Sequence, residues 1–137
     1  MKRQRVQHFL AEKCWAIDSR ARSLVRDVLL RLPDEFDTES ISDVFSVYAG
    51  SVFPPGGAGW AVVLQWDILN APFEASVREA KRKKEVARGV IALNLAHCTL
   101  RHTPNTIHTK RAYNEAKELA IDWGFSREIT SMEKELL

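Results

Sequence analysis

Hydrophobic residues recur at steps of four and three along the first 32 positions of the chain. The recurring positions are Leu10, Cys14, Ile17, Ala21, Leu24 and Val28. Because this spacing places side chains on one face of an α-helix, it predicts an amphipathic helix that packs on the core. Asp18 and Ser19 are both favoured N-cap residues, so the segment is either one long helix or a helix pair, and Pro33 ends it.

Strict alternation of large apolar residues marks the middle of the chain. The alternating positions are Trp60, Val62, Leu64, Trp66 and Ile68. Alternation of this kind predicts a strand with one apolar face. Strand-forming residues also run from Val44 to Phe53, and the Pro-Pro-Gly-Gly sequence at 54–57 is typical of a turn. We therefore predict a β-hairpin over about residues 44–69.

A helix is predicted to follow from Pro72, a residue suited to a first helical turn, to about Ala87. The next segment, 90–96, is a short apolar run that periodicity alone assigns to neither helix nor strand. Gly89 before it and the alternation of bulky residues within it favour a strand. The result would be a strand–helix–strand unit over residues 60–97, with the two strands parallel.

Two more helices are predicted in the C-terminal part. The sequence Thr-Pro-Asn-Thr at 103–106 is a break and a cap, and the helix after it runs to Trp123, with Gly124 in the position that ends helices. A last helix is expected from about Ser126 to Leu136. Taken together, the pattern predicts an α+β fold with a small sheet, and the length predicts a single domain over residues 1–137.

Charge is segregated along the chain, although the net charge is only +2. Residues 33–77 contain seven acidic side chains and no Lys or Arg, whereas residues 78–111 contain nine basic side chains against two acidic ones. A basic stretch of this density is typical of a surface that attracts a polyanion. The candidate nucleic-acid-binding residues are Arg78, Lys81, Arg82, Lys83, Lys84, Arg88, Arg101, Lys110 and Arg111.

The segment from Lys117 to Thr130 resembles the middle of a DNA-binding helix-turn-helix, with a small residue at Ala120 and a glycine at Gly124 four positions later. The exposed positions expected on its second helix are mostly acidic. Since acidic side chains repel phosphates, we interpret this segment as a structural helix pair rather than a DNA reader.

Histidine and cysteine supply the remaining candidates for chemistry. The sequence His-Cys-Thr-Leu at 97–100 resembles one half of the motif of two-histidine phosphoesterases, and this resemblance implies a catalytic role for His97. The family needs a second His-x-Thr element on a facing strand, which His102 and His108 do not provide. We expect no metal and no cofactor, and we expect Cys14 and Cys98 to be core thiols.

Two functional interpretations stand about equally, and an enzyme is the least favoured. In the first, a small accessory protein contacts the phosphate backbone of DNA or RNA through residues 78–111, with low sequence specificity. In the second, the chain is a protein-binding adaptor or inhibitor without catalytic activity. The absence of about 20 consecutive apolar residues argues against a membrane protein, and the cysteine content favours the cytoplasm. The oligomeric state is left open.

Overall fold

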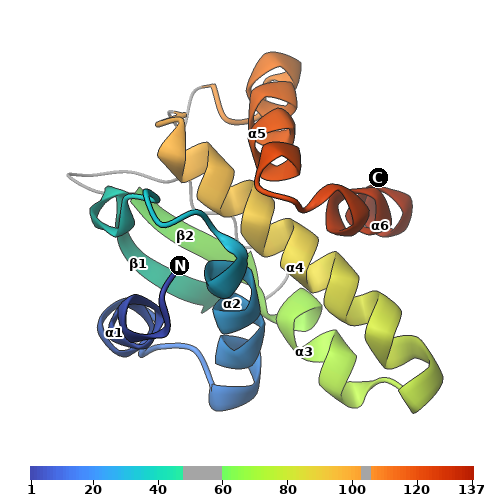
Figure 1. The fold of residues 1–137 in the computed structure, drawn as a ribbon. Helices are drawn as coiled ribbons and strands as arrows, with labels where there is room; N and C mark the ends of the chain where they lie inside the picture. Colours follow the sequence, from blue (N-terminus) through green and yellow to red (C-terminus); the bar gives the residue numbers. More distant parts are fainter. Residues whose placement is uncertain (48–59, 103–105) are drawn as a thin grey trace.

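The structure of the protein is a computed structural model that describes residues 1–47, 60–102 and 106–137. The chain begins with two helices, α1 (Arg3–Lys13) and α2 (Ser19–Arg31), joined by a tight turn (Figure 1). The Asp18 carboxylate accepts a hydrogen bond from Ala21 N–H at 2.9 Å and so caps α2. The helix pair is therefore the correct one of the two alternatives.

The sheet consists of two parallel strands, β1 (Ile41–Val47) and β2 (Trp60–Gln65), with Val44 opposite Val62. A 3₁₀ turn, η1 (Thr38–Ser40), leads into β1. The predicted hairpin over 44–69 is wrong, because hairpin strands are antiparallel. Twelve residues separate the end of β1 from the beginning of β2. A connection of this length is longer than a typical hairpin loop and long enough to join parallel strands. The predicted turn at 54–57 lies outside the described residues.

The strand also ends earlier than predicted, because helix α3 (Trp66–Glu74) begins directly after Gln65. Val62 and Leu64 are buried as the alternation requires, but Trp66 and Ile68 belong to α3. Leu69 and Pro72 are buried in α3, so its apolar residues have helical spacing as well. The positions of Trp66 and Ile68 fit both the alternation of a strand and the spacing of an apolar helix face, and the burial of Leu69 and Pro72 favours the helix.

The longest helix, α4 (Val77–Thr99), runs through the segment that we predicted as a strand. The strand–helix–strand unit over 60–97 is therefore wrong. Gly89 does not interrupt the helix, because its missing side chain makes room for a neighbour: a Cβ atom there would lie 2.5 Å from the Glu128 carbonyl oxygen. Ile91, Leu95 and Cys98 are buried along one side of α4, which is helical spacing.

The chain ends with α5 (Lys110–Asp122) and α6 (Ser126–Leu136), as predicted. Gly124 between them has φ 98°, the left-handed conformation that favours glycine. Figure 1 shows α4 crossing the molecule, with α1, α2 and the sheet on one side and α5 and α6 on the other. One cluster of buried residues joins all these elements, with contributions from α1, α2, both strands, α3, α4, α5 and α6. The protein thus has an α+β fold, and within the described residues no helix is long and apolar enough to cross a bilayer.

Candidate nucleic-acid interface

The first half of α4, residues 77–88, is a charged helix that stands mostly in solvent. Only Val86 and Ala87 are buried in this half. Lys81, Lys84 and Arg88 follow one another at steps of three and four, so they lie on one side of the helix. Arg82 and Lys83 point to other sides, which divides the basic residues into two groups with different surroundings.

The first group faces α6 and is largely neutralised. Arg82 forms ion pairs with Glu79, at 2.6 Å, and with Glu135 of α6. Lys83 Nζ lies 3.6 Å from the same Glu135 carboxylate. The ion pairs with Glu79 and Glu135 also raise the pKa of Arg82. These two basic side chains are therefore engaged within the protein and contribute little free positive charge.

The second group keeps its charge. Among residues 1–47, 60–102 and 106–137, no carboxylate lies within ion-pair distance of Arg78, Lys81 or Lys84. Arg78 and Lys81 are exposed, and Lys84 is partly exposed. Arg88, at the inner end of the stripe, pairs with Asp27 of α2 at 2.7 Å. This ion pair joins α4 to α2 one helical turn after Lys84, the last of the three unpaired cations.

The remaining predicted residues lie at the opposite end of α4. Arg101 follows the helix with φ 56°, and Lys110 and Arg111 begin α5. Arg111 Nε lies 3.3 Å from the Glu115 carboxylate. The rise of 1.5 Å per residue places Arg78 and Thr99, the last helical residue before Arg101, about 32 Å apart along the helix axis. Six of the nine predicted residues thus lie on the first half of α4 and three at its opposite end, so the nine do not form a single patch.

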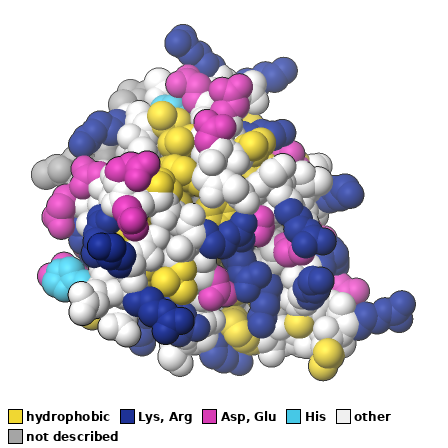
Figure 2. Space-filling view, viewed as in Figure 1, with side chains coloured by type: hydrophobic (Ala, Val, Ile, Leu, Met, Phe, Trp, Pro, Cys, Tyr) yellow, Lys and Arg dark blue, Asp and Glu magenta, His cyan; other side chains and the backbone are white. Residues whose placement is uncertain are grey.

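Helix α2 adds a basic residue that the sequence analysis did not include. Arg20 is exposed, and its guanidinium carbon lies 5.4 Å from the centre of the Phe73 ring of α3. This contact places the beginning of α2 beside the end of α3, which leads into α4. Figure 2 shows Lys and Arg side chains gathered over the part of the molecule where α2 and the first half of α4 lie, with carboxylates between them. The excess of basic over acidic residues in the first 32 positions was the available signal.

The histidines form a small cluster at the end of α4. His97 Nδ1 and His102 Nδ1 are 2.8 Å apart, so one ring donates a hydrogen bond to the other. The backbone closes α4 at the same place, because His102 N–H donates to the His97 carbonyl at 3.1 Å and Arg101 is left-handed. His97 is only 7% exposed and lies on a helix. The strand arrangement of the two-histidine phosphoesterases is therefore absent around it.

Neither the cysteines nor the histidines are arranged for metal binding in the part of the chain that the structure describes, where no three His, Cys, Asp or Glu side chains converge suitably. Burial raises the pKa of Cys14 and of Cys98 to about 12, so both thiols stay protonated. They are buried in the core, as the sequence analysis predicted.

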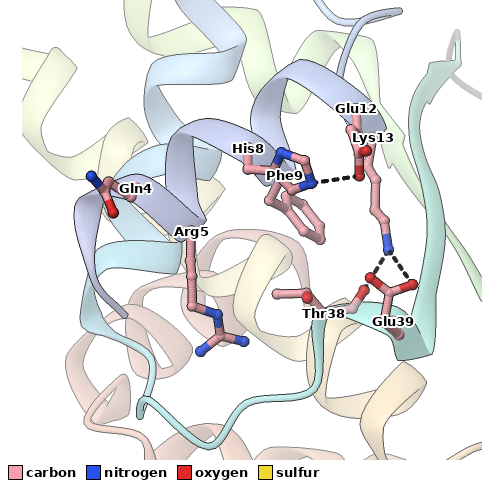
Figure 3. A pocket seen from close by; sticks show the side chains of 8 residues that line it. All are labelled: Gln4, Arg5, His8, Phe9, Glu12, Lys13, Thr38 and Glu39. Carbon is pink, nitrogen blue, oxygen red and sulfur yellow. Dashed lines mark hydrogen bonds and ion pairs between the residues drawn. The ribbon is translucent and has the colours of Figure 1, made fainter.

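A pocket of about 210 Å³ lies between α1 and η1 (Figure 3). Two cations border it, but both hold the chain in place. Arg5 donates to the backbone carbonyls of Asp34 and Phe36, and Lys13 Nζ donates to the carbonyls of Thr38 and Ile41, both at 2.6 Å. Because these donors already fix residues 34–41 on α1, and Glu12 and Glu39 also line the pocket, it offers little free positive charge to an anion.

Comparison with protein families, with curated proteins and with solved structures gives no match. The free cations of α4 and the neighbouring Arg20 are the arrangement with the clearest chemistry, because they attract anions and are not neutralised by the fold. We call Arg20, Arg78, Lys81 and Lys84 the α2–α4 basic surface.

Proposed function

We propose that this protein binds the phosphate backbone of nucleic acid through the α2–α4 basic surface. The observation that supports the proposal is that Arg78, Lys81 and Lys84 have no carboxylate partner in the described structure, although the fold neutralises Arg82 and Lys83 beside them. Lys81 and Lys84 are one helical turn apart and so present two ammonium groups on the same side. A row of cations of this kind can neutralise successive phosphates of a nucleic-acid backbone and release their counterions.

The chemistry of this surface favours contact with the backbone over reading of bases. Residues 77–88 contain no Asn, Gln, Ser or Thr, and amide side chains are the usual readers of adenine. Lys and Arg contacts to phosphates position a protein without carrying sequence information. We therefore expect an affinity that depends little on sequence and falls steeply with salt.

Charge reversal at two positions tests the proposal. The variant Lys81→Glu/Lys84→Glu should lose most of its affinity for DNA and RNA at low salt. The matched control is Arg101→Glu/Lys110→Glu, which changes the net charge equally at the other end of α4 and should bind nearly as the wild type does. Fluorescence anisotropy with labelled oligonucleotides measures both. Equal losses in the two variants, or no binding by the wild-type protein, would refute the proposal.

A protein partner is the second candidate, and a different surface favours it. An apolar groove of about 400 Å³ lies where β2 and α4 meet α5 and α6, and Val63, Leu93 and Met132 are among its lining residues. Apolar grooves of this kind are typical of protein-binding sites. Under this alternative, the protein would co-purify with a partner that nucleic acid does not displace, and Leu93→Asp would abolish the association.

A further inference from the structure

Trp15 is the most exposed aromatic side chain described, with 68% of its surface accessible. Tryptophan is enriched at binding interfaces, because its ring offers a large apolar surface and its N–H a polar contact. The position of Trp15 is fixed by its neighbours, because Cys14 and Ile17 on either side are fully buried. The Ile17 N–H also donates to the Cys14 carbonyl at 3.1 Å, which closes the turn. The fold thus holds the indole outward on a rigid turn.

This turn adjoins the α2–α4 basic surface. It leads through Asp18 directly into α2, where Arg20 stacks over Phe73 of α3 at 5.4 Å. Figure 1 shows the turn between α1 and α2, the end of α3 and the beginning of α4 at the same end of the molecule. The turn that carries Trp15, the first turn of α2 with Arg20 and the beginning of α4 with Lys81 and Lys84 therefore lie at one end of the fold. Asp18, Glu74 and Glu79 are acidic side chains at this end; the Asp18 carboxylate is occupied by the cap of α2, and the Glu79 carboxylate pairs with Arg82.

We infer that the nucleic acid bound by this surface is single-stranded, with a base stacked on Trp15 and the adjoining phosphates on Arg20, Lys81 and Lys84. The inference rests on the proposed function and specifies its substrate. In a duplex both faces of an internal base are covered by its neighbours, so the base cannot stack on a side chain, whereas every base of a single strand presents a free face. Aromatic side chains beside a basic groove are the usual means of binding single strands without sequence preference.

The test compares Trp15→Ala with the wild-type protein on a short oligothymidine strand and on a duplex of equal length. Loss of one stacked base should weaken binding to the single strand about tenfold or more. Binding to the duplex should be weaker from the start and unchanged by the substitution. Ile121→Ala is the matched control, because Ile121 is also an exposed apolar side chain but lies on α5. In addition, oligothymidine should quench part of the tryptophan fluorescence of the wild type, and this part should vanish in Trp15→Ala.

The outcomes separate the inference from the proposed function. Equal affinity of Trp15→Ala and wild type for the single strand would overturn the role of Trp15, even if Lys81→Glu/Lys84→Glu abolishes binding. Preference for the duplex would overturn the single-strand assignment. Absence of binding to either oligonucleotide at low salt would refute the proposed function, and the inference with it. Circular dichroism of Trp15→Ala should match that of the wild type, since the side chain is exposed.

Discussion

Gly89→Ala is the substitution for which the structure predicts a reversal of the usual effect. Alanine in place of glycine inside a helix ordinarily stabilises by about 1 kcal/mol. Here the new Cβ would lie 2.5 Å from the carbonyl oxygen and 2.9 Å from the carbonyl carbon of Glu128 in α6. Overpacking costs about 1–3 kcal/mol, and a backbone neighbour that cannot rotate away places this site at the upper end. We therefore expect a net loss of about 2 kcal/mol.

The free energy of unfolding is measured by urea denaturation followed by circular dichroism. Gly124 is the matched comparison, because a Cβ there would meet nothing within 4 Å and the cost comes only from its φ of 98°. Gly124→Asn should recover part of the stability lost in Gly124→Ala, since asparagine tolerates the left-handed conformation. Gly89→Asn should recover nothing relative to Gly89→Ala. If Gly89→Ala were as stable as the wild type, the close contact between α4 and α6 would be wrong.

Three further predictions concern stability. Leu64→Ala should destabilise the protein by about 2–5 kcal/mol in thermal or chemical melts because Leu64 is buried, whereas Gln65→Ala should cost far less; similar costs would contradict the facing of β2. Burial and neighbouring histidines lower the pKa of His97 from 6.5 to about 4. As the pH falls, His97 is therefore protonated in the unfolded chain before it is protonated in the folded protein, and the free energy of unfolding should decrease between about pH 6.5 and pH 4. A flat profile in this range, or the same decrease in His97→Leu, would contradict this. Glu128 is buried and pairs with Arg31 at 2.6 Å; Glu128→Gln should lower the unfolding free energy at neutral pH by about 1–3 kcal/mol, and an unchanged free energy would show that the pair contributes nothing.

The elements that the sequence predicted correctly are those whose pattern is local. The burial of Ala21, Leu24 and Val28 on α2, the capping by Asp18 and the turn at Gly124 each follow from neighbouring residues, and the structure confirms them. The strand predicted for 90–96 is wrong because Gly89 resembles a break in the sequence. Its actual role is contact with Glu128, which is distant in the chain. The parallel pairing of β1 and β2 likewise depends on how the chain returns between them.

The candidate site was predictable in part for the same reason. Density of charge identified the first half of α4, but it did not show which cations stay free. Arg82 and Lys83 are neutralised by Glu135, about fifty residues later in the chain, and no local pattern reveals that pairing. Arg20 joins the surface only because α2 packs beside α3. Free charge is therefore a property of the tertiary structure.

The most direct test of the proposed function is the salt dependence of binding in Lys81→Ala/Lys84→Ala compared with the wild type. The logarithm of the binding constant for a single strand falls linearly with the logarithm of salt concentration, by about 0.7 for each phosphate neutralised. If both lysines contact phosphates, the double variant should reduce the magnitude of this slope by about 1.4. A slope identical to that of the wild type would contradict the proposal, because the two side chains would then release no counterions.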